Sequence, residues 1–446
     1  MNKGIYFIIP VLLFLFSVFG AAVAWGDVSF QCPCVDDPTA INVERVNYNT
    51  NNHEETYTIE CSVGGRNIAC KHMTAGDGFA LMGDGSEIFV FGFHDVTSLY
   101  PLPDGTLGTC IPPDGSDCDT KAEADAQVQK EGLVGVQQSA PTMVMKEGWD
   151  FYLTISTVPM VIRPDLFDPH TVHFHGFANA ASIFDGEPMS SISINQGASL
   201  TYYYNLNGRP GTHLYHCHVE ATEHMQMGML GNLFVLADKD TGTAPNRFAY
   251  NDTDDSTQFD VEYAIQVISF DPIFHAANLD IQPLPFADML DTYPLLNGRG
   301  YPDTINPNDL PAPPTKIEER TNRGVPGVTP SSQKLPSLIT ATAGDRILIR
   351  LSSVATVDLY TISASGLPMQ IVGKDAKIFR GKGDPAGPAL YQTVQSINIG
   401  GGESYDIIIN TTGVSQGTYF LYSTNLNELT NDRQDFGGMM TEIVIN

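Results

Sequence analysis

The chain has 446 residues and carries 23 Lys and Arg against 51 Asp and Glu, which gives a formal net charge of −28. This acidic balance argues against nucleic-acid binding, because contacts to phosphate need an excess of Lys and Arg. With 42% hydrophobic residues, 41 Gly and 29 Pro, the composition is typical of a loop-rich globular protein of two or three domains, and not of a coiled coil or a disordered chain.

The first residues predict an export signal. Lys3 supplies a positive start, residues 5–19 form an apolar run, and Ala-Val-Ala at 22–24 forms a small-residue cleavage site. The run is short for a membrane span, so an uncleaved anchor is the less favoured alternative. We expect residues 1–24 to be a signal peptide, and the chain to be exported to a periplasm, the cell surface or the extracellular space.

Six of the seven cysteines lie in the first 118 residues and predict up to three disulfides in an oxidising compartment. Cys110 and Cys118 flank a Pro/Gly/Asp loop and are the easiest pair to assign. The sequence leaves open the pairing of the other four: Cys32, Cys34, Cys61 and Cys70. We expect residues 25–65 to form an irregular, cysteine-bearing N-terminal extension. The seventh cysteine, Cys217, stands alone.

From residue 66 onward, short runs rich in Val, Ile, Tyr and Thr alternate with Gly, Pro, Asn and Asp, which predicts antiparallel β-sandwiches or barrels. The exceptions are a helical stretch at 121–131 and a Pro/Asn-rich segment at 302–336 that we expect to be a long loop. Three short patterns also recur in the same order. They are a strand after Gly at 148–156 and 344–352, an Ile-Asn-x-Gly turn at 194–197 and 397–400, and a Gly-Thr strand start at 211 and 417. The sequence therefore predicts an all-β protein with two copies of one sandwich, at residues 66–240 and 250–446.

Five of the eleven histidines fall in two short runs, and a sixth follows the second run closely. Side chains alternate faces along a strand, so residues two apart share a face and adjacent residues point to opposite faces. The prediction is two sites back to back. The first has His170, Cys217, His224 and Met229, and the second has His173, His175, His216 and His218.

The donor types of each set indicate copper. Two imidazoles, a thiolate and a weak thioether from Met229 are the ligands of a blue copper electron-transfer site. Four neutral imidazoles suit a copper site that meets dioxygen or another small oxidant. Cys217 is bonded along the chain to His216 and His218, so an electron at the first site has a short covalent route to the second. We expect these three residues to carry the catalytic electron transfer.

Zinc is weighed against copper here, and ordinary structural roles are preferred for the other methionines, histidines and glutamates. Structural zinc favours more thiolates and does not use a thioether, so zinc is the weaker metal assignment. We expect Met225, Met227 and His213 to pack ordinarily. A solvated loop face is a better interpretation of Glu220 and Glu223 than a proton relay. No role is assigned to the histidines that have no partner nearby in the sequence: His53, His72, His94 and His275.

At these motifs the sequence resembles the multicopper oxidases, a family built from cupredoxin sandwiches. The motifs in family order are Ala140-Pro141-Thr142, Glu147-Gly148, His173-Phe174-His175-Gly176, Asp185-Gly186-Glu187-Pro188 and Gly211 to His218, with Met229 five residues after His224. The resemblance implies that the first set is the type 1 copper site, and that the second set belongs to a trinuclear copper cluster. The second copy is similar to the family's metal-free domain through Gly366-Leu367-Pro368-Met369, Gly402 to Asp406 and Gly417-Thr418-Tyr419.

The chain departs from the family in its number of histidine pairs. The family's cluster takes four His-x-His pairs from two domains, whereas this chain has two pairs, and Tyr422-Ser423-Thr424 stands where the second copy would carry His-Cys-His. One chain alone therefore lacks the full cluster. We expect a homo-oligomer to bring two such faces together around a shared cluster. The alternative is that the second copy or a separate partner caps the site and leaves fewer coppers.

Two other functions stay open. The sequence is also similar to the two-domain copper nitrite reductases, which carry an acid at the position of His173 and no histidine at that of His218. The third hypothesis is a copper electron-transfer or copper-binding protein without oxidase activity. For the enzyme, the expected reductant is a small molecule or a metal ion, and the expected acceptor is dioxygen.

Overall fold

The computed structural model describes residues 28–48, 56–110, 118–134, 136–177, 180–208, 210–311 and 331–446. The predicted signal peptide at 1–24 and His53 lie outside these ranges. Among the described residues, no helix combines the length and the apolar character needed to cross a membrane.

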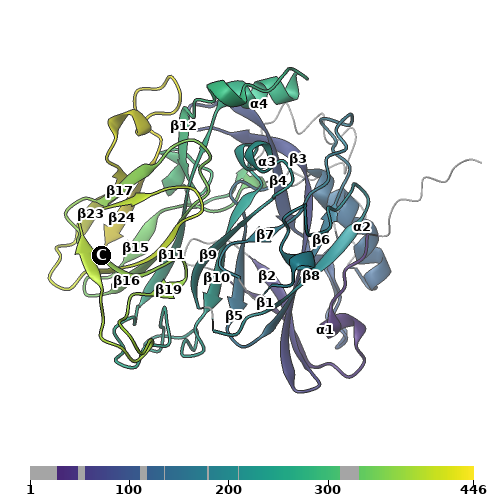
Figure 1. The fold of residues 1–446 in the computed structure, drawn as a ribbon, viewed down its shortest axis with the longest axis horizontal. Coiled ribbons are helices and arrows are strands. Elements are labelled where there is room, and N and C mark those ends of the chain that lie inside the picture. Colours follow the sequence, from purple (N-terminus) through teal and green to yellow (C-terminus); the bar gives the residue numbers. More distant parts are fainter. Residues whose placement is uncertain are drawn as a thin grey trace, which may run out of the picture.

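Two sheets form the first half of the molecule, drawn from purple to teal in Figure 1. The larger has the order β1 (Ile41–Asn47), β2 (Tyr57–Val63), β3 (Arg66–Leu81), β6 (Asp150–Thr157) and β8 (Ser199–Asn205), with β4 (Glu87–Asp95) also paired to β3. The smaller has the order β5 (Ala140–Lys146), β10 (Leu230–Leu236), β9 (Gly211–His216) and β7 (His173–Phe174). Alternate residues such as Phe151, Leu153 and Leu233 fill the core between them, because strand side chains alternate faces.

The second half, in green and yellow, lies beside the first and also has two main sheets (Figure 1). One has the order β12 (Tyr293–Leu296), β11 (Val261–Phe270), β16 (Arg346–Ser353), β22 (Ser404–Asn410), β18 (Met369–Lys374) and β19 (Lys377–Ile378), with β20 (Gln392–Val394) paired to β18. The other has the order β15 (Ile339–Ala341), β24 (Met440–Ile445), β23 (Gly417–Ser423), β17 (Tyr360–Ala364) and β21 (Ser396–Ile399).

The two halves repeat one pattern of strand pairing. In the first, β6 runs antiparallel to β8 and parallel to β3, and in the second, β16 runs antiparallel to β22 and parallel to β11. Likewise β10 lies between antiparallel β9 and parallel β5, as β24 lies between antiparallel β23 and parallel β15. The predicted all-β fold and the internal repeat are confirmed, whereas the domain boundaries at 66–240 and 250–446 stay predictions.

The expectation of an irregular extension at 25–65 is wrong for the residues described there. The short helix α1 (Pro33–Asp36) is followed by β1 and β2, which extend the first sheet by antiparallel pairing to β3. Apolar and polar residues alternate along β2 and along the first part of β1, which is the pattern of a strand.

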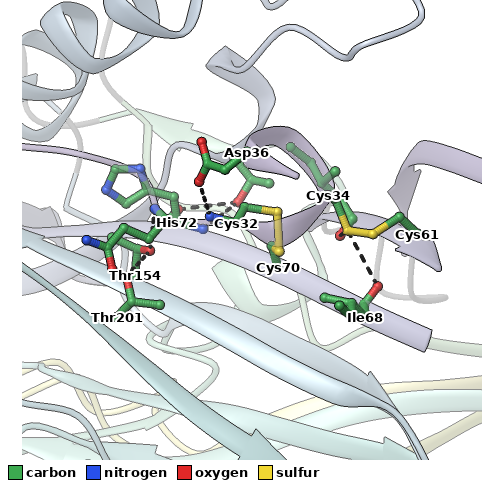
Figure 2. Close-up of a disulfide and its surroundings, with 12 residues drawn as sticks. Cys32, Cys34, Asp36, Cys61, Ile68, Cys70, His72, Thr154 and Thr201 are labelled. Atoms are coloured by element: carbon green, nitrogen blue, oxygen red, sulfur yellow. Dashed lines mark hydrogen bonds between the residues drawn. A yellow bond between two sulfur atoms is a disulfide. The ribbon is translucent and has the colours of Figure 1, made fainter. Parts of the chain in front are cut away.

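Three disulfides are present, and the free cysteine is Cys217. Cys110 pairs with Cys118 as predicted, and the two pairings that the sequence left open are Cys32–Cys70 and Cys34–Cys61. Figure 2 shows these last two side by side, where they attach the segment around α1 to β2 and β3. Disulfides of this kind restrict the unfolded chain and so stabilise the folded N-terminal segment.

Four α-helices and five short 3₁₀ helices complete the described residues. The stretch predicted at 121–131 is confirmed as helix α2 (Lys121–Val134), and the other two helices are α3 (Ala221–Gln226) and α4 (Pro272–Leu279). The 3₁₀ helices are η1 (Thr97–Leu99), η2 (Ser182–Phe184), η3 (Phe286–Asp288), η4 (Asp303–Ile305) and η5 (Leu426–Glu428). The expected long loop at 302–336 is partly wrong, because besides η4 it holds β13 (Leu310–Pro311) and β14 (Ser331–Gln333), which pair with each other.

Candidate metal centres

The first predicted set meets at the end of β9. The Sγ atom of Cys217 lies 3.2 Å from Nδ1 of His224, which is in α3, and 3.9 Å from Nδ1 of His170. All three side chains are buried, and their donor atoms lie within 4.8 Å of one another. His170 and Ile194 exchange two backbone hydrogen bonds, which hold His170 in place. His170 is not part of a regular strand, since β7 begins only at His173.

Met229 is fixed in the same loop by its backbone. The Cys217 amide donates to the Met229 carbonyl at 3.0 Å, and the Met229 amide donates to the His224 carbonyl at 2.9 Å. The loop from 217 to 229 is thereby closed, and the Met229 side chain is buried in the core cluster that also contains Cys217.

Burial sets the protonation of this group. It lowers the pKa of His170 well below its usual value and that of His224 to about 4, so both imidazoles are neutral at pH 7. Burial raises the pKa of the Cys217 thiol to about 11, although amides such as that of Thr171, 3.4 Å from Sγ, oppose the rise. A cation bound here must displace the thiol proton, as metal–thiolate chemistry requires.

Three of the four histidines in the second predicted set converge. Donor nitrogens of His173, His175 and His216 lie within 4.8 Å of one another, and the Nε2 atoms of His175 and His216 are 3.0 Å apart. The ring of His218 lies beside them, with its centroid 5.2 Å from that of His173 and 5.5 Å from that of His216, but it is outside the converging group.

Backbone carbonyls orient this second group. Nδ1 of His173 is 2.6 Å from the Asp185 carbonyl, and Nδ1 of His216 is 2.7 Å from the Cys217 carbonyl. A carbonyl only accepts, so each Nδ1 carries the proton and each Nε2 keeps a free lone pair for a metal. Burial, together with the neighbouring imidazoles, lowers the pKa of His216 to about 3 and that of His175 to about 4.

The two groups lie back to back across the Cys217 backbone. His216 ends β9 and its ring joins the second group, whereas the side chain of the next residue, Cys217, joins the first. The strand alternation expected from the sequence therefore accounts for both placements.

Two acidic residues next to these groups, Glu220 and Glu223, differ in exposure. The prediction of a solvated face holds for Glu220, which is exposed, and is wrong for Glu223, which is 8% exposed and accepts a 2.7 Å hydrogen bond from Asn278 in α4. Burial raises the pKa of Glu223 to about 7, and the nearby Glu220 and Asp168 add to the rise. The contact to Asn278 joins residues far apart in the chain, and no local pattern signals it.

The expectation of ordinary packing is confirmed for three other residues. Met227 is fully buried in the core of the first half, and Met225 packs against a neighbouring cluster. The ring of His213 lies 4.6 Å from that of Phe177, and its Nδ1 is 3.0 Å from the His175 carbonyl.

Sequence models of the multicopper oxidase family match residues 120–240 and 293–443, together more than half of the chain. The chain belongs to the multicopper oxidase family. It is similar to Laccase-2 of Cryptococcus neoformans var. grubii, with 26% identity over 286 residues, and to Laccase-1 of Cryptococcus neoformans var. neoformans, with 25% identity over 276 residues. These matches cover 61% of this chain but only 40% and 38% of the two laccases, so the chain spans less than half of these relatives.

Solved structures share the fold of this family member. The blue copper oxidase from Nitrosomonas europaea has a TM-score of 0.56 at 19% identity, covering 84% of this chain and 85% of that one. The copper nitrite reductase from the same organism has a TM-score of 0.51 at 13% identity, covering 85% and 94%. At these identities the likeness establishes the fold, and it confirms the predicted pair of cupredoxin-like sandwiches.

Proposed function

We propose that this multicopper oxidase is an exported enzyme that takes electrons singly from a reductant and reduces dioxygen. In this proposal His170, Cys217, His224 and Met229 hold a type 1 copper, and His173, His175, His216 and His218 hold copper at a second site. The observation that carries the proposal is the back-to-back placement of the two donor groups on either side of the Cys217 backbone.

The donors present fit copper at both places. A buried thiol between two Nδ1 atoms, with a buried methionine in the same closed loop, matches the thiolate-and-imidazole preference of a type 1 site. Three imidazole nitrogens converge without a thiolate at the second group, which suits copper that has open positions.

Copper bound in these sites supplies one-electron redox chemistry. The chain's own residues position the donors, exclude water and connect the two sites. Burial of His170 and His224 keeps water from the thiolate, and the closed loop holds the donors in place before a metal arrives. The Cys217 backbone and the His216 ring give the covalent route from the first site to the second. The carbonyls of Asp185 and Cys217 fix the proton on Nδ1, so that His173 and His216 present Nε2.

The test is Cys217→Ser in the copper-loaded protein. We expect wild type to be intensely blue and to consume dioxygen with a simple reductant, and Cys217→Ser to lose both the blue absorbance and electron entry while keeping its fold by circular dichroism. Met225→Leu is the control, since Met225 is near in the chain but packs in another cluster. A copper-loaded wild type that is colourless, with a spectrum unchanged by Cys217→Ser, contradicts the type 1 assignment.

One observation favours a second candidate function, electron transfer without oxidase activity. The second half has Tyr422 and Thr424 where a complete cluster needs histidines, and its sole histidine, His275, is buried against Phe270 in another place. A blue protein with one copper per chain and no dioxygen consumption would establish this alternative. Reduction of nitrite in place of dioxygen would favour the hypothesis that the protein is a copper nitrite reductase.

A further inference from the structure

A segment of the second half of the molecule packs over the proposed type 1 site. It runs from residue 271 to 291 and contains α4 and η3. Its residues Leu279, Leu284 and Met289 pack against the core cluster that contains Cys217. In Figure 1, α4 lies at the edge of the molecule beside α3, the helix that carries His224. Both donors are fully buried, so an electron that reaches them crosses a layer of side chains.

Hydrogen bonds attach this segment to its neighbours. Asn278 Nδ2 donates to Glu223 Oε1 in α3 at 2.7 Å. Gln226 Nε2, also in α3, donates to Asp291 Oδ1 at 2.9 Å. The guanidinium of Arg163 donates to the carbonyl of Asn278, which brings a loop of the first half to the same helix. Three segments therefore form one surface, which we call the α4 face: residues 159–168, 218–226 and 271–291.

The α4 face exposes large apolar side chains that lie together. Ile273 is 70% exposed, Leu290 66% and Phe286 49%. The amides of Ile273 and Leu290 both donate to the carboxylate of Asp271, at 2.8 and 2.9 Å. The ring of Phe286 packs on that of Phe274 in α4, with centroids 5.3 Å apart. Exposed apolar side chains that lie together indicate an interaction site, whereas single scattered ones do not.

The same face is strongly acidic. Its three segments contain eight Asp and Glu against one Arg, whereas the whole chain has 51 Asp and Glu against 23 Lys and Arg. That one cation, Arg163, is buried and paired with Asp165. Glu220, Asp280 and Asp288 are exposed. An apolar centre with an acidic rim is complementary to a basic protein surface that is itself apolar at its centre.

We propose that the α4 face is the docking surface for a basic electron-donor protein. Each encounter moves one electron, so that the reduced partner is oxidised by one electron and the type 1 copper goes from Cu(II) to Cu(I), with no bond or proton transferred. Attraction between opposite charges gives fast association that weakens as salt is added. The inference rests on the proposed function in placing copper beneath this face, but docking itself needs no copper.

The experiment uses a small, lysine-rich c-type cytochrome as the probe. The same cytochrome with succinylated lysines is the charge-reversed control. Two double variants change the α4 face at exposed positions. One removes charge, by Asp280→Asn with Asp288→Asn, and the other removes apolar surface, by Ile273→Gln with Leu290→Gln.

A matched control removes two charges at the opposite end of the molecule. Asp238 and Asp384 are both exposed. Asp238 follows β10, which begins next to Met229 and runs about 20 Å to Leu236. Asp384 lines a cavity with Glu147, which follows β5 at that same end of β10. Asp238→Asn with Asp384→Asn therefore changes the net charge equally and leaves the α4 face intact.

Binding is measured first, by calorimetry with copper-free protein at low and at higher salt. Wild type should bind the native cytochrome at least about tenfold more tightly than the succinylated form. The charge variant should weaken binding by about 3–10-fold at low salt and by less at higher salt, because salt screens exposed charges. The apolar variant should weaken binding by about tenfold at both, because apolar contact is not screened. The control variant should match wild type.

Electron transfer is measured next, in copper-loaded protein. Stopped-flow bleaching of the blue absorbance by the reduced cytochrome should be slowed in the two face variants and not in the control variant. Hydroquinone, a small neutral reductant, should bleach wild type and all three variants at the same rate.

The outcomes separate this inference from the proposed function. Equal binding of the native and succinylated cytochromes overturns the inference, and so does an equal loss of binding in the charge variant and the control variant. Slower bleaching by hydroquinone in the apolar variant, with cytochrome binding unchanged, assigns the face to a small reductant and also overturns it. A copper-loaded wild type that is not blue contradicts the proposed function, and calorimetry with the copper-free chain still decides the docking.

Discussion

At the scale of single residues, the loop between Cys217 and Met229 bears on which methionine belongs to the proposed type 1 site. Its backbone bonds place residue 229 directly behind Cys217, while Met227 two residues earlier is also fully buried in the same core. Burial alone therefore does not distinguish the two, and the family spacing favours Met229.

We predict that Met229→Leu keeps the blue absorbance and raises the reduction potential, because an aliphatic side chain removes a weak axial donor that stabilises the oxidised site. Redox titration followed at the blue band measures this. The swap nearly conserves volume, so its cost in the free energy of unfolding should stay below about 1.5 kcal/mol. Met227→Leu is the control. If it shifts the potential and Met229→Leu does not, the axial ligand has been misplaced by two residues.

The donor groups could be predicted because they depend on short-range geometry. Strand alternation around Cys217 separates its side chain from that of His216 whatever the rest of the fold does. The packing of the second half against the donors could not be predicted in this way. Gly402 reaches His175 from 227 positions further along the chain, and the fold alone brings them together.

At the scale of elements, His72 joins four segments in the first half. Its Nδ1 is 2.8 Å from the Tyr100 hydroxyl and its Nε2 is 2.7 Å from Ser156 Oγ in β6. The Tyr100 hydroxyl donates to Asp125 in α2 at 2.7 Å, and the ring of Phe30 stacks on His72 with centroids 5.2 Å apart. This network fastens α2 and the N-terminal segment to β3, beside the disulfides in Figure 2.

This network predicts a pH dependence of stability. Burial, helped by the Lys121 charge, lowers the pKa of His72 from 6.5 to about 3. Below pH 6.5 the His72 imidazole of the unfolded chain takes up a proton, whereas the same ring in the folded chain stays neutral. The free energy of unfolding should therefore decrease by about 1.4 kcal/mol per pH unit between pH 6.5 and 3 through this residue alone. Urea unfolding of His72→Gln and wild type across this range should show a steeper loss for wild type.

Phe30→Leu is the control for that measurement, since it disturbs packing on the same ring and leaves the titrating group in place. It should lower stability and keep the wild-type slope. Parallel curves for wild type and His72→Gln would contradict the prediction.

Elements were predictable where the pattern was long or local. The stretch at 121–131 has a helical composition with an acidic first turn, and it forms α2. The strands at 310–311 and 331–333 are too short for any periodic signal, and they exist because they pair with each other across the intervening residues.

At the scale of the whole molecule, the two halves are joined by buried polar contacts. Asp406 in β22 accepts a 2.6 Å hydrogen bond from the Thr212 hydroxyl in β9, and also binds Arg350 and Tyr250 of its own half. Ser352 Oγ donates to Asn232 of β10 at 2.6 Å. A buried carboxylate needs such partners, so the second half is fixed against the strand that carries His216. The second half is therefore a structural support for the strand that carries His216.

The second site is open toward solvent, and this bears on how the molecule assembles. His173 is 21% exposed and His218 is half-buried, although their neighbours Cys217 and His224 are fully buried. The loop that follows His175 also exposes Met189, at 94%, and Ile192, at 48%. Imidazoles open to solvent, in a half of the molecule that also exposes apolar side chains, suit closure by a further surface.

We predict that a symmetric homo-oligomer closes this site, because a symmetric interface places like residues opposite one another and can bring further histidines to the shared copper. Copper per chain should exceed one only in the oligomer, measured by metal analysis across a size-exclusion profile with light scattering. His173→Ala and His218→Ala should lose the extra copper and keep the blue absorbance, whereas Cys217→Ser should lose the blue absorbance in either state. A strictly monomeric protein with one copper per chain would contradict the prediction and would favour electron transfer without oxidase activity.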